Sequence, residues 1–95
     1  MCAVKIKGLE YNVDYNDIKN FFKGCGYVNN SVQLGLNREG RNNGFGAILF
    51  NKEEDAQHAV EDLNEKYIGN RWVELTLMSY GDYREFNSSK YTGYG

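Results

Sequence analysis

The chain of 95 residues has few of the residues that build disulfide frameworks and metal sites. Its two cysteines, Cys2 and Cys25, are too few for the framework of a secreted domain, and neither lies in a Cys-x-x-Cys motif or beside a histidine. The one histidine, His58, has no nucleophile or second ligand at a matching spacing. The sequence therefore predicts a reduced, intracellular chain with no metal, no cofactor and no enzymatic activity.

Long apolar runs are also missing. No stretch approaches the roughly 18 apolar residues that a membrane span needs, and no charged and then apolar leader precedes the first predicted strand. We expect a domain that does not contact membranes and that lies in the nucleus or cytoplasm, or in an organelle if a targeting segment lies outside this sequence. A chain of this length suffices for one domain that buries roughly two thirds of its surface.

Acidic residues outnumber basic ones, and the formal net charge is -2. Almost half of the acidic residues fall in one predicted helix and its end: Glu53, Glu54, Asp55, Glu61, Asp62 and Glu65. Basic residues on predicted strands and loops elsewhere are Lys5, Lys7, Arg38, Arg41, Lys66 and Arg71. Most of the acidic run is typical of a solvated helix face, so one side of the domain can still be basic.

Alternating apolar residues predict strands over residues 2–7, 32–36, 43–50 and 72–77. In the third strand the alternation directs Gly44, Gly46, Ile48 and Phe50 toward a core and Phe45, Ala47 and Leu49 toward a possible ligand face. Glycine weakens a strand unless something must approach closely, and we expect a helix to pack against Gly44 and Gly46. In the last strand Val73, Leu75 and Leu77 point inward.

Helical spacing predicts two helices. Residues 15–23 carry an apolar stripe after a possible cap pair, Asp14 with Asp17. A second helix, which ends near Leu63, follows a similar pair, Asn51 with Glu54. A Gly-Asn pair at residues 69–70 indicates a tight hairpin turn.

The element order is β-α-β-β-α-β, which predicts an α+β fold of the ferredoxin-like type. Its four-stranded antiparallel sheet carries two helices on one face. We assign residues 1–78 to this domain. Residues 79–95 are rich in Gly and Tyr without clear periodicity, so we expect a partly flexible extension in which residues 80–86 pack back onto the domain.

The stretch Asn43-Gly44-Phe45-Gly46-Ala47-Ile48-Leu49-Phe50 resembles the signature K/R-G-F/Y-G/A-F-V-x-F/Y of the RNA-recognition-motif family. It departs at Asn43, where the family has a basic residue, and at Ala47, where it has an exposed aromatic. The first strand has Lys5 where the family offers a second ring. Of the usual stacking positions only Phe45 remains.

The sequence is more similar to one branch of this family than to its general signature. Lys7-Gly8-Leu9-Glu10-Tyr11, Arg41 after Glu39-Gly40, and Arg71-Trp72 resemble the quasi-RRM of the heterogeneous nuclear ribonucleoprotein F/H group over roughly residues 4–78. Two departures are Glu10, where the group has proline, and Phe45, where it has a small or acidic residue. The resemblance implies binding of G-rich single-stranded RNA through loops at one end of the fold.

The residues themselves support a loop site. Tyr11 and Trp72 can hold a base between flat faces, while Lys7, Arg41 and Arg71 can bind phosphates or base edges. Taken singly, Trp72 is equally typical of the rim of a core, Arg41 of a solvated loop charge, and Tyr11 is more often a packing residue over a helix end. Only their conjunction favours binding. The full candidate RNA-binding set is Lys5, Lys7, Tyr11, Arg38, Arg41, Phe45, Lys66, Arg71 and Trp72.

We therefore expect a monomeric, non-enzymatic domain that binds G-rich or U-rich single-stranded RNA in RNA processing, with possible help from the sheet face. An alternative is a protein-interaction module that binds a partner in a ribonucleoprotein complex through its helical face, which the acidic second helix would suit. A small acylphosphatase-like hydrolase shares the topology, but such enzymes need an arginine in the loop after the first strand, and residues 10–13 have none.

Overall fold

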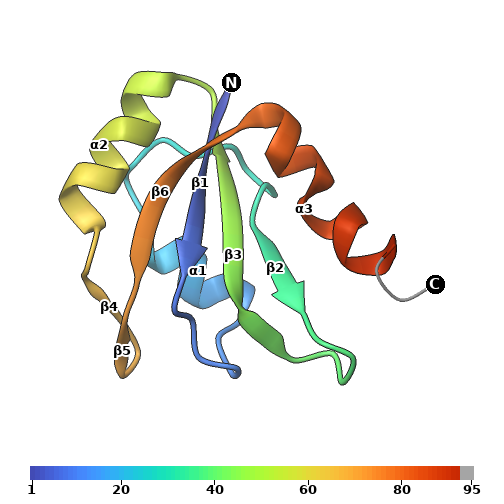
Figure 1. Cartoon of the computed structure of the whole chain (residues 1–95). Coiled ribbons are helices and arrows are strands. Elements are labelled where there is room, and N and C mark those ends of the chain that lie inside the picture. Colours follow the sequence, from blue (N-terminus) through green and yellow to red (C-terminus); the bar gives the residue numbers. More distant parts are fainter. Residues whose placement is uncertain (93–95) are drawn as a thin grey trace.

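The computed structural model describes the backbone of residues 1–92 and the side-chain surroundings of residues 1–86. In this part of the chain a four-stranded sheet and a small hairpin are combined with three helices (Figure 1). The elements in order are β1 (Cys2–Lys7), α1 (Tyr15–Phe21), β2 (Gln33–Leu36), β3 (Asn42–Phe50), α2 (Glu53–Leu63), β4 (Tyr67–Ile68), β5 (Arg71–Trp72), β6 (Glu74–Ser79) and α3 (Tyr80–Thr92).

The main sheet is antiparallel and has the strand order β2-β3-β1-β6. Strand β1 is central and pairs on both sides, with Val4 opposite Ile48 of β3 and Leu77 of β6. Strands β4 and β5 form a separate hairpin in which Tyr67 lies opposite Trp72. The predicted ferredoxin-like sheet with two helices on one face is confirmed.

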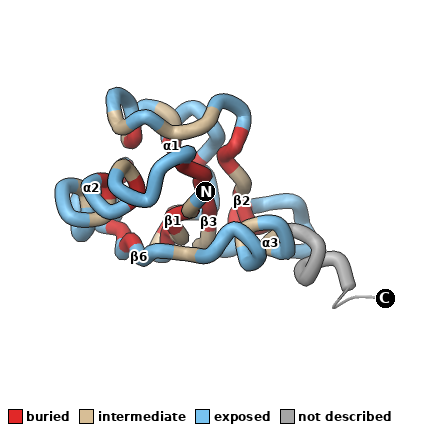
Figure 2. Tube along the Cα trace, turned by 90° about the horizontal axis from the view of Figure 1, so that it is seen from above, coloured by how far each residue is buried: buried red, intermediate tan, exposed pale blue. Residues whose placement is uncertain are grey.

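The core lies on one face of this sheet. Alternation sends Val4 and Ile6 of β1 to the side where α1 and α2 lie, and Ile48 and Phe50 of β3 follow them (Figure 2). There the Phe22 ring packs edge-on against Phe50, with ring centroids 6.2 Å apart. All five side chains are fully buried, so this layer supplies most of the apolar stabilisation of the fold.

Gly46 does permit a close approach, but the expectation that a helix makes it was wrong. A Cβ at this position would lie 3.1 Å from Leu9 Cδ1 and 3.3 Å from the Gln33 carbonyl oxygen. The neighbours are therefore the segment that follows β1 and the adjacent strand β2. Gly44 has φ +98°, a conformation that favours glycine, at the point where β3 leaves the β2–β3 loop.

The opposite face of the sheet is covered in part by α3 (Figure 2). Tyr83 Oη of this helix donates to the Ser31 carbonyl oxygen at 2.5 Å, and Gln33 Nε2 donates to the Tyr83 carbonyl oxygen at 3.4 Å. Ala47 and Leu49, which the alternation placed on an open ligand face, are buried beneath it. That part of the prediction was wrong because a helix forms where a flexible extension was expected.

Helix α3, which makes these contacts, begins directly after β6. The expectation that residues 80–86 pack back onto the domain agrees with the Tyr83 contacts. The boundary at residue 78 stays a prediction, and residues 93–95 of the expected extension lie outside the described part of the chain.

Two predicted helix caps had different outcomes. At α1 the Asp14 carboxylate accepts the Asp17 N–H (3.0 Å), and the Asp17 carboxylate accepts the Asp14 N–H (3.1 Å), so the cap pair is confirmed. At α2 the first cap position is Lys52, which makes no side-chain cap bond, so the predicted role of Asn51 was wrong. The predicted tight turn at residues 69–70 is confirmed by the β4–β5 pairing. Leu77 lies opposite Val4 and therefore on the core face, as predicted, but it is 45% exposed because β6 is an edge strand.

These caps generate a paired prediction. Asp14→Ala removes a side chain that satisfies a free N–H at the start of α1, so it should lower the free energy of unfolding by about 1 kcal/mol. Asn51→Ala removes a side chain without such a bond and should change it by less than about 0.5 kcal/mol. Urea denaturation followed by circular dichroism measures both. Equal losses for the two variants would contradict the assignment of the caps.

Candidate nucleic-acid interface

Three connections lie together at one end of the domain, at the bottom of Figure 1: the β1–α1 loop, the β2–β3 loop and the β4–β5 hairpin. The end of β1 is tied to the start of β3, because the N–H groups of Gly8 and Leu9 both donate to the Gly44 carbonyl oxygen at 2.9 and 3.1 Å. Gly8 has φ +100°, and a Cβ there would lie 3.1 Å from the Trp72 carbonyl oxygen. Because Gly8 has no side chain, the backbone after β1 can turn in close contact with β5.

Glu10 joins the first of these loops to the hairpin. Its Oε1 accepts the backbone N–H of Asn70 at 2.9 Å, and Gly69 at the turn has φ +67°. This is the position at which the sequence departs from the proline of the quasi-RRM pattern. The carboxylate thus holds the two loops together in a way that proline, which has no side-chain acceptor, does not.

Beside this tie lies a cavity of about 380 Å³, here called the hairpin groove. Its walls include Lys7, Tyr67, Asn70, Arg71, Trp72 and Glu74. The Tyr67 and Trp72 side chains, which are cross-strand partners, are 65% and 50% exposed. Three of the predicted site residues, Lys7, Arg71 and Trp72, are therefore brought together around one space.

Tyr11 and Arg41 form a second pair at the same end. The Arg41 guanidinium lies 5.3 Å from the centre of the Tyr11 ring, within the range of a cation–π contact. The β2–β3 loop that carries Arg41 is ordered by Asn37, whose Oδ1 accepts the N–H groups of Glu39 (2.9 Å) and Arg41 (3.1 Å). The Tyr11 side chain is 62% exposed, so its ring has a face available for a ligand.

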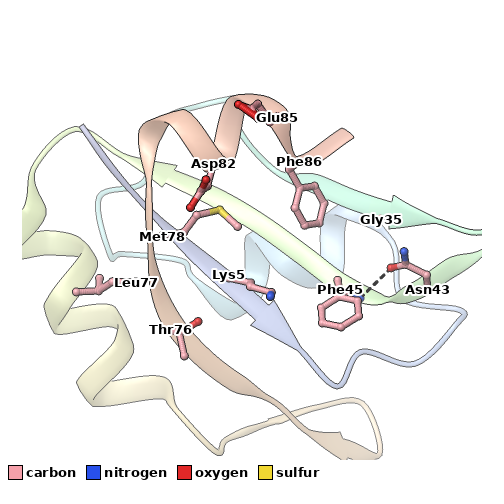
Figure 3. Close-up of a pocket in the computed structure, with 10 residues that line it drawn as sticks. All are labelled: Lys5, Gly35, Asn43, Phe45, Thr76, Leu77, Met78, Asp82, Glu85 and Phe86. Carbon is pink, nitrogen blue, oxygen red and sulfur yellow. Dashed lines mark hydrogen bonds between the residues drawn. The ribbon is translucent and has the colours of Figure 1, made fainter. Parts of the chain in front are cut away.

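The third feature is a cavity of about 580 Å³ on the sheet face, here called the sheet groove (Figure 3). Lys5, Phe45 and Met78 line it from the sheet, and Asp82, Glu85 and Phe86 line it from α3. Lys5 Nζ lies 5.1 Å from the centre of the Phe45 ring. The predicted residues Lys5 and Phe45 are thus adjacent, but they share their groove with two carboxylates.

The two remaining candidates line neither groove. Arg38 lies on the exposed β2–β3 loop. Lys66 has a backbone role between α2 and β4, where its N–H donates to the Leu63 carbonyl oxygen and its own carbonyl oxygen accepts the Val73 N–H, both at 3.0 Å.

Sequence reasoning also missed contributors. In the hairpin groove these are Tyr67, Asn70 and Glu74. Tyr67 could have been predicted from the sequence, because the hairpin pairing places it opposite Trp72. In the sheet groove they are Asp82, Glu85 and Phe86. The spacing of three residues between Tyr80, Tyr83 and Phe86 was the available signal for the helix that carries them.

The described residues give little support for a metal site, a membrane span or a reactive thiol. Among the residues that the structure describes, no group of three or more His, Cys, Asp or Glu side chains lies close enough to hold a metal ion, and no helix is long and apolar enough to cross a membrane. Burial raises the pKa of the Cys25 thiol, and the carboxylates of Asp62 and Asp55 raise it further. The thiol is therefore protonated at neutral pH and is a poor nucleophile.

Comparison with known proteins gives related sequences. RNA-binding protein 12 of Homo sapiens is 34% identical over 75 residues, which are 79% of this chain and 8% of that protein. G-rich sequence factor 1 of Homo sapiens is 34% identical over 74 residues, 76% of this chain and 15% of that protein. Heterogeneous nuclear ribonucleoprotein H of Mus musculus is 30% identical over 81 residues, 85% of this chain and 18% of that protein. The chain thus spans less than a fifth of the length of each of these relatives.

Among solved structures, the crystal structure of the Glorund qRRM2 domain has a TM-score of 0.77 and 27% identity, and the match covers 88% of this chain and 96% of that one. Together with the ribonucleoprotein H match, this confirms the resemblance to the quasi-RRM branch. A family model described as RNA recognition motif matches residues 4–74, which include most of β1, the whole of β3 and the β4–β5 hairpin. Since this match covers most of the chain, the protein belongs to the RNA recognition motif family of RNA-binding, non-enzymatic domains.

Proposed function

We propose that this domain binds G-rich single-stranded RNA through its loop end and acts in RNA processing as part of a longer protein. The observation that carries the proposal is the contrast between the two candidate surfaces. The loop end has Lys7, Arg41 and Arg71 beside the exposed rings of Tyr11 and Trp72. The sheet face, which is the usual platform of the family, is partly covered by α3.

The loop residues supply the two interactions that single-stranded RNA requires. Stacking of a base on an aromatic side chain contributes roughly 1 to 3 kcal/mol per base, and Tyr11, Tyr67 and Trp72 all have exposed rings. Arginine and lysine add charge-assisted hydrogen bonds to phosphates. Because the Glu10–Asn70 bond fixes two of the loops relative to each other, less ordering is needed when RNA binds.

The sheet face is less suited to an extended strand. Ala47 and Leu49 are buried there, so the length of β3 is not open to successive bases. Two carboxylates, those of Asp82 and Glu85, line the sheet groove with one cation, Lys5. One carboxylate, that of Glu74, lines the hairpin groove with two cations, Lys7 and Arg71, so phosphate is disfavoured more in the sheet groove. Lys5 and Phe45 can therefore contribute at one point, while the loops carry most of the contact.

We favour G-rich over U-rich RNA for a chemical reason. Guanine presents two acceptors, O6 and N7, that an arginine fork can bind at the same time, and Arg41 and Arg71 both lie at the loop end. The name of one relative, G-rich sequence factor 1, agrees with this choice. A single domain with so few contacts binds weakly, so neighbouring modules of the whole protein would set its working affinity.

Substitution in the hairpin groove tests the site. Trp72→Ala removes a stacking surface and Arg71→Ala removes a cation, so each should weaken binding of a hexanucleotide with three guanines by about five-fold or more. Fluorescence anisotropy with labelled RNA measures the loss, in lithium chloride so that the RNA stays single-stranded. The control Lys52→Ala removes an exposed cation at the start of α2 and should bind as the unmodified domain does. Undiminished binding by the folded Arg71→Ala, Trp72→Ala double variant would refute the loop site.

Salt dependence provides a second test. Two phosphate contacts, by Lys7 and Arg41, with Arg71 left to bind a guanine edge, should give a slope of about -1.4 in a plot of log affinity against log salt for single-stranded RNA. Arg41→Ala should make this slope shallower by about 0.7 because one contact is lost. Anisotropy titrations over a series of lithium chloride concentrations measure both slopes. A slope near zero for the unmodified domain would show that phosphate contacts do not drive binding.

A further inference from the structure

We propose that Glu10 is a positioning residue for RNA binding. Its carboxylate holds the β4–β5 hairpin against the β1–α1 loop, so that Arg71 and Trp72 are fixed beside Lys7 before RNA arrives. The proposal rests on the proposed function, because it concerns the same loop end. Glu10 stands where the quasi-RRM pattern has proline, so the role belongs to this chain rather than to the branch.

The contact is a hydrogen bond between residues 60 positions apart in the chain. Glu10 Oε1 accepts the Asn70 N–H at 2.9 Å. The same oxygen would lie 3.1 Å from a Cβ at residue 69, where glycine has φ +67°. The carboxylate therefore lies directly against the tip of the hairpin, and the glycine leaves room for it.

The segment that carries Glu10 is itself held by the domain. The Glu10 carbonyl oxygen accepts the Val13 N–H at 3.2 Å, and the N–H groups of Gly8 and Leu9 donate to the Gly44 carbonyl oxygen. The Leu9 side chain is buried in the core. Glu10 thus extends from a fixed backbone, and its side chain can fix the hairpin in turn.

The hairpin depends on this bond at its tip. Strands β4 and β5 have two residues each and pair with each other, and so short a ribbon is marginally stable alone. Its base is held where the Glu65 N–H donates to the Val73 carbonyl oxygen at 2.8 Å and the Val73 N–H to the Lys66 carbonyl oxygen at 3.0 Å. Among the described residues, no other hydrogen bond joins the turn at 69–70 to a different element.

The bond determines the geometry of the hairpin groove. Arg71 and Trp72 follow Asn70 directly and line the groove together with Lys7 of β1. Because the Glu10–Asn70 bond joins the two segments that carry these side chains, it limits how far the walls of the groove can move apart. Without it, RNA would have to order the hairpin on binding, which costs free energy.

Charge alone predicts the opposite effect, so the sign of the change separates the two explanations. A carboxylate beside a site for a polyanion disfavours phosphate, and its removal should strengthen RNA binding if only its charge mattered. Positioning requires that removal of Glu10 weaken binding. Glu74 provides the matched comparison, because its carboxylate lines the same groove and makes no hydrogen bond with the described residues.

Three single variants make this comparison. Glu10→Ala removes the acceptor and should weaken binding of the hexanucleotide with three guanines by about three-fold. Glu10→Gln keeps an acceptor oxygen without the charge and should bind at least as tightly as the unmodified domain. Glu74→Ala removes a carboxylate without such a bond and should bind more tightly. Fluorescence anisotropy in lithium chloride measures all three, and circular dichroism checks that each is folded.

Two further measurements show that Glu10 acts through the hairpin. In a Trp72→Ala background the loss caused by Glu10→Ala should be smaller, because one of the groups that Glu10 positions is gone. Without RNA, hydrogen exchange of the Asn70 amide, followed by NMR, should be faster in Glu10→Ala than in Glu10→Gln.

Unchanged or tighter binding by Glu10→Ala would overturn the positioning role. Equal losses in Glu10→Ala and Glu10→Gln would also overturn it, because the effect would then belong to the charge. Either result leaves the loop site standing. No binding of the hexanucleotide by the unmodified domain would overturn the proposed function itself, and the positioning role with it.

Discussion

The pairing of β1 with β3 and β6 at one fixed register is the constraint on which the rest of the structure depends. Because side chains alternate along a strand, this register sends Val4, Ile6 and Ile48 together onto the helices. The same register sends Lys5 and Phe45 to the other face. A shift of one residue would exchange core and ligand face, so the apolar layer under α1 and α2 also fixes the position of the functional side chains.

The register also determines where the loops lie. Strand β1 ends beside the start of β3, and the bonds from Gly8 and Leu9 to Gly44 close that end of the sheet. The β1–α1 loop, the β2–β3 loop and the β4–β5 hairpin consequently meet there, and Glu10 joins two of them. In this account a domain of net negative charge presents a small surface of basic and aromatic side chains at one end, while five of its thirteen acidic residues lie on α2.

Most of the fold could be predicted from the sequence, because the patterns that indicate its strands and helices are local. Alternation predicted β1 with its observed bounds, and the Asp14–Asp17 spacing predicted the cap of α1. Helix α3 was missed, although Tyr80, Tyr83 and Phe86 follow one another at a helical spacing of three residues. Its position on the sheet depends on long-range contacts such as Tyr83 with Ser31, which local patterns do not indicate. For the same reason the burial of Ala47 and the acidic wall of the sheet groove could not be read from β3 alone.

The candidate site was predictable where it follows strand ends and hidden where it depends on tertiary contacts. Lys7, Arg71 and Trp72 do share one groove, and Arg41 does lie on Tyr11. Lys66 was selected for its charge, yet what the structure shows is the backbone connection that it makes between α2 and β4. Charge in a sequence indicates what a side chain can bind, but the fold determines which charges lie together.

The most direct test of the account is an amide-resolved NMR titration of the domain with G-rich single-stranded RNA. The account predicts the largest shifts at Tyr11, Arg41, Arg71 and Trp72, followed by smaller ones at Lys5 and Phe45. Shifts confined to the exposed faces of α1 and α2, or no shift with any RNA, would contradict it and would favour a protein partner on the helical side.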